Sequence, residues 1–94
     1  PKATGVKAGA VREPGAEVEI SGTVRNVQAA VMPDVRVYAA SAPARAVVTD
    51  RHGRYTLRIR TNDRAVFELE GYERREIDVT EGGSLDIELE PAMN

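Results

Sequence analysis

The sequence lacks several residue types on which binding and catalytic sites commonly depend. Its 94 residues include no cysteine and no tryptophan, and His52 is the only histidine. Without cysteine the chain can form neither a disulfide nor a thiolate zinc site. Its aromatic residues are three tyrosines and one phenylalanine, so few rings are available for a sugar-binding surface.

Charge and hydropathy exclude further classes of protein. The 13 basic and 15 acidic residues give a net charge of -2 and are mixed along the chain. The chain therefore lacks the basic stripe of a nucleic-acid binder and the polybasic segment of a membrane-surface protein. No apolar run is long enough to cross a bilayer, and no signal-peptide core is present. We expect no nucleic-acid partner and no membrane insertion.

The length fits one domain with a single core. Residues 1–16 are rich in Gly, Pro and Ala and predict an N-terminal tail or linker, to which Val6 and Val11 could add a short strand. Alternation of apolar and polar residues then predicts a sandwich domain over residues 17–90, followed by a C-terminal tail at 91–94. Because the chain starts at Pro1 rather than Met, we expect it to be processed or cut from a longer one.

Seven segments carry the alternating pattern: 17–25, 35–40, 46–49, 54–60, 66–70, 74–79 and 85–90. Turn residues separate them at intervals of about 8 to 12 residues, and no stretch has a helical period. The pattern predicts an all-β fold, a seven-stranded antiparallel β-sandwich. Its expected core is Val18, Ile20, Val24, Val35, Val37, Val47, Tyr55, Leu57, Ile59, Phe67, Leu69, Ile77, Val79, Leu85, Ile87 and Leu89.

Outward-facing charges also carry information about strand pairing. The outward residues of 54–60 include three arginines, whereas those of the last two segments are Asp and Glu. If the fold places these strands side by side, ion pairs of about 0 to 1 kcal/mol each would favour that pairing.

Residues 50–56, Asp-Arg-His-Gly-Arg-Tyr-Thr, form the clearest local pattern. Asp50 can accept hydrogen bonds from backbone N–H groups just after it, and Gly53 can adopt φ > 0 without steric cost. Tyr55 then begins an alternating strand in the inward phase. The pattern predicts a hairpin turn with structural roles for Asp50, Gly53 and Tyr55, and it leaves His52 in solvent.

Several short motifs occur in the order and spacing of a known family. They lie at 20–24 (Ile-Ser-Gly-Thr-Val), 32–37, 48–57, 71–72 (Gly-Tyr) and 85–89. With them, residues 17–90 resemble the carboxypeptidase regulatory-like domains, whose fold is the transthyretin-like, or prealbumin-like, Greek-key sandwich.

The resemblance implies a non-catalytic accessory module. Domains of this family stand beside peptidases, at the start of outer-membrane nutrient receptors, or in surface and secreted proteins. By resemblance we expect an extracytoplasmic location and a role as a spacer or protein-interaction domain of a larger protein. Its partners would be other domains of that protein or a separate protein, and we expect a monomer.

The residues themselves argue against catalysis and metal binding. No serine stands in a Gly-x-Ser-x-Gly elbow, and the aspartates are not spaced as in a calcium loop. Hydroxyisourate hydrolases resemble transthyretin but end in Tyr-Arg-Gly-Ser, whereas this chain ends Pro-Ala-Met-Asn. We expect no enzyme activity, no catalytic residue, no cofactor and no metal.

Two further binding modes stay open. Tyr38 is the aromatic residue in the outward phase, beside Arg36, so these two are the candidate contacts for a carbohydrate stacked on an exposed ring. The third strand, 46–49, could accept a strand from a partner at a sheet edge. Its neighbours Pro43, Arg45 and Asp50 are residues that discourage such pairing.

Overall fold

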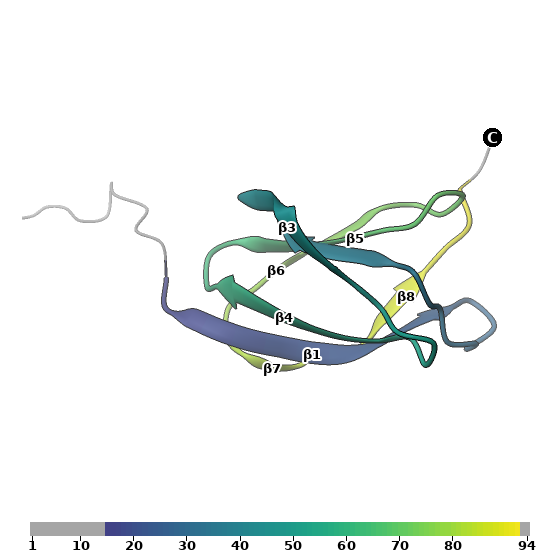
Figure 1. Ribbon diagram of the computed structural model, residues 1–94, viewed down its shortest axis with the longest axis horizontal. Helices are drawn as coiled ribbons and strands as arrows, with labels where there is room; N and C mark the ends of the chain where they lie inside the picture. The colour runs from purple at the N-terminus through teal and green to yellow at the C-terminus, as the bar shows by residue number, and fades with distance from the viewer. Residues whose placement is uncertain (1–14, 93–94) are drawn as a thin grey trace, which may run out of the picture.

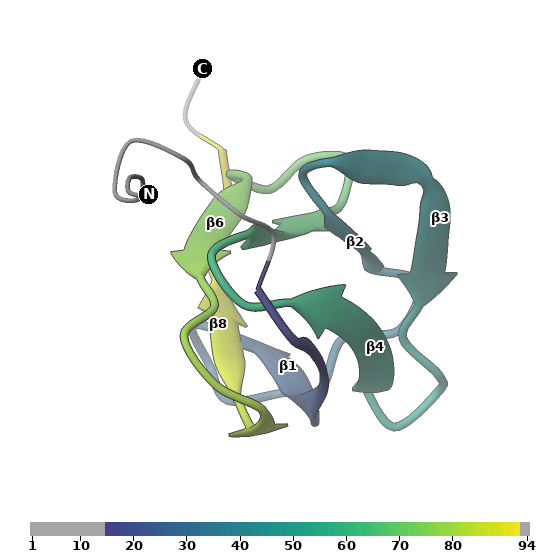
Figure 2. The ribbon, with the colours of Figure 1, turned by 90° about the vertical axis from the view of Figure 1, so that its left-hand side faces the viewer.

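The computed structural model describes residues 15–92, which form eight β-strands and no helix. The strands are β1 (Glu17–Asn26), β2 (Arg36–Ala39), β3 (Ala42–Val48), β4 (Arg54–Arg60), β5 (Arg64–Glu68), β6 (Arg75–Asp78), β7 (Gly83–Ser84) and β8 (Ile87–Leu89). They form two sheets that pack face to face (Figure 1; Figure 2). The predicted all-β sandwich is confirmed, with one strand more than expected.

The first sheet, called the β1 sheet, is built around its longest strand. β4 pairs antiparallel with one edge of β1, and β7 and β8 follow one another along the other edge. Both short strands run parallel to β1, with Ile20 opposite Gly83 and Val24 opposite Ile87. The expectation of a wholly antiparallel sandwich is therefore wrong at this edge.

The last expected strand, 85–90, is interrupted at its start. The backbone N–H of Leu85 donates to the Ser21 carbonyl at 2.7 Å, and the Asp86 carboxylate accepts from the backbone N–H of Thr23 at 2.9 Å. A side-chain oxygen thus replaces a backbone carbonyl, and pairing resumes at Ile87. β8 is therefore shorter than the predicted strand, and β7 pairs with β1 just before the predicted range begins.

The second sheet, called the β2 sheet, has the order β3-β2-β5-β6 and is antiparallel throughout. β3 begins at Ala42, earlier than the expected start at 46, and its register against β2 shifts between Val37 and Ala39. Pro43 lies inside β3, where it is tolerated because β3 is an edge strand.

The turn at 50–53 has the predicted local geometry. However, the two strands that it connects, β3 and β4, do not pair with each other as the strands of a hairpin would. Asp50 Oδ1 accepts from the backbone N–H groups of His52 at 2.8 Å and Arg54 at 3.0 Å, and Gly53 has φ 75°. The turn leads from β3 in the β2 sheet to β4 in the β1 sheet. The hairpin prediction is therefore wrong, because distant partner strands and not the turn decide where each strand pairs.

Most of the expected core is buried between the sheets, with Val18, Val47, Leu69, Ile77 and Leu85 only partly buried. Four further residues are buried although the alternating pattern did not place them in the core: Met32, Tyr38, Ala65 and Val66. Met32 is held by its backbone N–H, which donates to the Val24 carbonyl at 2.9 Å. Its carbonyl accepts from the hydroxyl of Thr49, a buried polar side chain that also accepts from the N–H of Val35.

The charged strands pair differently from the expectation. β4 lies beside β1, where Arg58 forms an ion pair with Glu17 at 3.3 Å. The acidic side chains of β6 instead meet arginines of its own sheet and of the loop before it, Arg64 and Arg74. Charge pairing thus operates within each sheet.

The described chain enters and leaves the fold at opposite ends. Gly15 and Ala16 extend the β1–β4 pairing through hydrogen bonds with Thr61. After β8, the N–H of Ala92 donates to the Gly71 carbonyl at 2.9 Å, far along the long axis from Gly15 (Figure 1). The rest of the predicted N-terminal tail and the end of the C-terminal tail lie outside the described residues.

Candidate functional site

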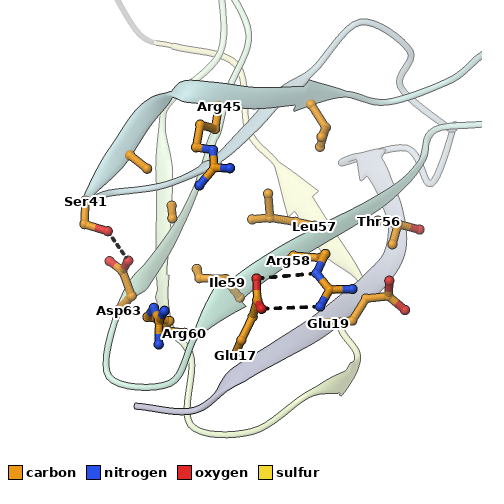
Figure 3. Close-up of a pocket in the computed structure, with 13 residues that line it drawn as sticks. Glu17, Glu19, Ser41, Arg45, Thr56, Leu57, Arg58, Ile59, Arg60 and Asp63 are labelled. Carbon is orange, nitrogen blue, oxygen red and sulfur yellow. Dashed lines mark hydrogen bonds and ion pairs between the residues drawn. The ribbon is translucent and has the colours of Figure 1, made fainter. Parts of the chain in front are cut away.

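A groove of about 600 Å³ lies between β3 and β4, the edge strands of the two sheets on one side of the sandwich. Its floor is apolar and includes Ala39, Val47, Leu57 and Ile59. Figure 3 shows Leu57 and Ile59 among the polar side chains that also line the groove, with Arg45 reaching from β3. Because β3 and β4 are both edge strands, the groove between them is the candidate binding site of the described residues.

Most of the polar side chains along the rim of the groove form ion pairs or hydrogen bonds with neighbouring residues. Glu17 pairs with Arg58, whose hydrogen bond and charge lower the pKa of the Glu17 carboxyl. The Ser41 hydroxyl donates to Asp63, and Arg60 donates to the Gly15 carbonyl at 3.2 Å. These contacts connect the start of β1 to β4 and the start of β3 to the turn before β5.

The structure places Tyr38 and Arg36 together but does not offer the tyrosine ring to a ligand. The Tyr38 side chain is only 8% exposed, and its hydroxyl donates to Glu68 at 2.8 Å. The Arg36 guanidinium lies 5.1 Å from the ring centroid. Burial, followed by the hydrogen bond to Glu68, raises the pKa of Tyr38. The expectation of an exposed ring is wrong, because Arg36 of the same strand lies over the ring and Glu68 of β5 binds its hydroxyl.

Tyr38 and Val66 lie beneath a connected set of ion pairs on the outer face of the β2 sheet. We call this set the charged lattice; it links, in order, Arg36, Glu68, Arg74, Glu76, Arg64 and Asp78. Its N–O distances run from 3.0 to 3.4 Å, and its side chains remain substantially exposed. The lattice shields two apolar side chains that the alternating pattern would have left in water.

A second cluster, called the β1 seam, joins β1 and β4 to the link between β7 and β8. It consists of Gly22, Thr23, Tyr55, Leu85 and Asp86. The Tyr55 hydroxyl donates to the Leu85 carbonyl, and a Cβ atom on Gly22 would collide with that same carbonyl. Burial and the nearby Asp86 charge raise the pKa of Tyr55 well above its usual range.

The sequence predicted that the Tyr55 ring points into the core, but it did not predict the hydrogen-bond partner of the Tyr55 hydroxyl. Its ring packs edge-on against Phe67, with centroids 5.2 Å apart, as its inward phase implies. The partner of its hydroxyl lies 30 residues away at Leu85. Gly22 in the inward phase of a strand was the available signal of a close backbone approach.

The predicted roles of Asp50 and His52 agree with the geometry. Hydrogen bonds from the backbone N–H groups of Arg54 and His52 lower the pKa of Asp50, which identifies the carboxylate as a turn-forming group. His52 is exposed in the turn. Within residues 15–92, no cluster of three or more His, Asp or Glu side chains could hold a metal ion. No helix in the same range is long and apolar enough to cross a membrane.

No family model and no curated protein matches the sequence. Among solved structures, a 3-chlorocatechol 1,2-dioxygenase from Rhodococcus opacus 1CP has a TM-score of 0.59 at 16% identity, over 85% of this chain and 61% of that chain. A double mutant of the shaft pilin SpaA from Lactobacillus rhamnosus GG has a TM-score of 0.50 at 13% identity, over 84% of this chain and 47% of that chain. This chain thus spans less than two-thirds of either protein, and at these identities the likeness shows the fold alone.

Proposed function

We propose that this chain is a non-catalytic accessory module of the carboxypeptidase regulatory-like kind, which acts as a spacer in a larger exported or cell-surface protein. The observation that carries the proposal is the path of the chain. It enters beside β1 at one end of the long axis and leaves after β8 at the other (Figure 1). A module threaded in this way holds its two neighbouring domains apart by its own length.

The use of the polar side chains supports a structural role. The charged lattice, the Glu17–Arg58 pair and the Ser41–Asp63 hydrogen bond each tie one strand or loop to another. Catalytic groups, in contrast, need an acid, base or nucleophile held free toward a substrate. We therefore assign these side chains to bracing the sandwich.

The family and the location rest on the sequence motifs. Support comes from the two motif glycines that the fold requires, Gly22 at the β1 seam and Gly53 with φ 75° in the turn. The occurrence of a similar sandwich in a shaft pilin is compatible with a module of surface proteins.

A second candidate function is recognition of a partner chain at the groove. The specific observation is that β3 and β4 are edge strands that border one apolar-floored groove. Recognition of a carbohydrate on Tyr38 has less support, since that ring is covered.

An exchange experiment in the parent protein distinguishes these roles. We would replace the module with an unrelated β-sandwich of the same end-to-end length, and separately with a flexible Gly/Ser linker. If the module is a spacer, the sandwich restores function and the linker does not. If neither restores function while Arg45→Glu in the native module abolishes it, the groove and not the length is what matters.

A further inference from the structure

We infer that the parallel pairing of β1 with β7 and β8 is a mechanical clamp that resists tension applied between the two ends of the chain. This inference rests on the proposed role as a spacer, because a spacer in a surface protein transmits any force between its neighbours. The inference concerns the force at which the module unfolds, and the proposed spacer role does not specify that force.

The directions of the strands produce the clamp. β1 is the first described strand and β8 the last. β8 pairs parallel with β1 from Val24 to Asn26, and β7, which precedes β8 in the chain, pairs parallel with β1 at Ile20 and Ser21. Tension pulls β1 toward its own N-terminal end and β8 toward its C-terminal end, so the two strands must slide past one another. Their hydrogen bonds are then loaded together along the strand direction, whereas a ladder pulled from one end opens one bond at a time.

The β1 seam reinforces the ladder at its weakest point. Between β7 and β8 the strand pairing is interrupted, but the bonds from Leu85 N–H to Ser21 and from Thr23 N–H to Asp86 close the gap. The Tyr55 hydroxyl holds the Leu85 carbonyl from β4. Sliding of β8 therefore also strains a third strand.

β1 is also held along its opposite edge. β4 pairs with it over seven residues, and the N–H of Val24 donates to the Gly53 carbonyl at 2.8 Å beyond the end of that ladder. Removing β1 under tension thus requires both ladders to fail. The Pro91 and Ala92 segment, which bonds to the loop at 71–73, would be peeled away first and pass the load to β8.

The test compares two pulling directions on the same full chain by single-molecule force spectroscopy. In one arm, handles are attached at both chain ends. In the other, the N-terminal handle is kept and the second is attached at an exposed Glu81→Cys, which is unique because the chain has no cysteine. Residue 81 precedes β7, at the same end of the ladder as the start of β1, so this arm peels the ladder open.

We expect the unfolding force between the chain ends to be several-fold higher than in the peeling arm. Equal forces in the two arms would overturn the clamp. They would leave the spacer role standing, since the exchange experiment tests that role independently. The comparison uses the intact fold and does not depend on any destabilised variant.

Two variants separate mechanical from equilibrium stability. Asp86→Ala removes one of the two bonds that close the gap in the ladder and should speed unfolding under a constant end-to-end force about fivefold. Val66→Ala is the matched control: it removes buried methyl groups from the outer face of the β2 sheet, away from the ladder, so it should lower equilibrium stability and leave the end-to-end unfolding rate nearly unchanged. If both variants sped unfolding in proportion to their loss of equilibrium stability, the ladder would not be what bears the load.

Discussion

The β1 seam and the charged lattice both join neighbouring strands, but they do so with different kinds of contact. In the seam, backbone atoms approach so closely that Gly22 has no room for a side chain, and a buried tyrosine reaches a carbonyl. In the lattice, long side chains meet in water, and the Arg64 and Asp78 side chains are 61% and 84% exposed. Close backbone contacts cannot relax without moving a strand, whereas exposed ion pairs can be re-formed or replaced by water.

The largest effect should come from Gly22→Ala. The new methyl group would meet the Leu85 carbonyl, and backbone on both sides limits any adjustment. We expect a loss of at least about 3 kcal/mol in unfolding free energy, at the upper end for an overpacked site. Urea denaturation measures it, with Gly71→Ala as the control because a Cβ there meets nothing within 4 Å. Gly71 has φ 91°, so equal losses would mean that the close approach at Gly22 costs no more than backbone strain at Gly71.

Gly53→Val should follow, with a loss of about 2 to 3 kcal/mol. Its φ of 75° strains any branched residue, and a Cβ would also lie 2.8 Å from the Val24 carbonyl oxygen and 2.9 Å from the Met32 nitrogen. Gly83→Val should cost less, because a Cβ there meets nothing within 4 Å although φ is 132°. A comparison of melting midpoints tests the order, and a larger loss for Gly83→Val would contradict it.

Thr49→Val extends the comparison to a buried side-chain hydrogen bond. The hydroxyl donates to the Met32 carbonyl at 2.7 Å and accepts from the Val35 N–H at 2.9 Å. Replacing it with a methyl group leaves both backbone groups without this partner, at a cost of about 1 to 3 kcal/mol. Chemical denaturation of this variant beside Thr56→Val, an exposed threonine on β4, provides the measurement. Indistinguishable midpoints for the two would mean that the Thr49 hydroxyl does not stabilise the fold.

Glu76→Gln should have a smaller effect, although it removes two links of the charged lattice at once. Exposed ion pairs contribute up to about 1 kcal/mol, and salt screens them. We expect the loss to fall within that range and to shrink at high salt. If the loss of unfolding free energy were independent of salt and as large as that of Thr49→Val, the lattice would stabilise the fold as much as the buried hydrogen bonds do.

The smallest effect should appear on acidification. The pKa values of Glu17 and Asp50 are lowered in the fold, so their stabilisation is present at neutral pH and is lost as the pH falls through the folded-state values. Stability should therefore decrease below pH of about 4. Glu17→Gln should make this dependence slightly shallower in urea titrations at several pH values. A stability that rises on acidification would contradict both assignments.

The sequence predicted best what depends on a few adjacent residues. The turn at Asp50 and Gly53 was recognisable because its acceptor and its left-handed glycine lie within four residues. The burial of Tyr38 was not, because it depends on Glu68 from another strand. In the same way, the position of Asp86 beside β1 was not recognisable, because its carboxylate bonds to Thr23, 63 residues earlier in the chain.

The candidate site was less predictable than the fold. The sequence indicated an edge strand after Pro43 but not that it lies across a groove from β4. Alternation assigns a residue to a face of its own strand, and it does not say which strands become edges. That choice follows from pairings between distant segments, such as β2 with β5.

The most direct test of the spacer role is the distance between the two ends of the module. Ala16→Cys and Ala92→Cys place spin labels on exposed residues beside β1 and after β8, and the chain offers no other cysteine. Pulsed electron paramagnetic resonance should give one narrow distribution at a long distance, as expected of ends held apart by a rigid sandwich. A broad distribution, or ends that lie close together, would contradict the spacer.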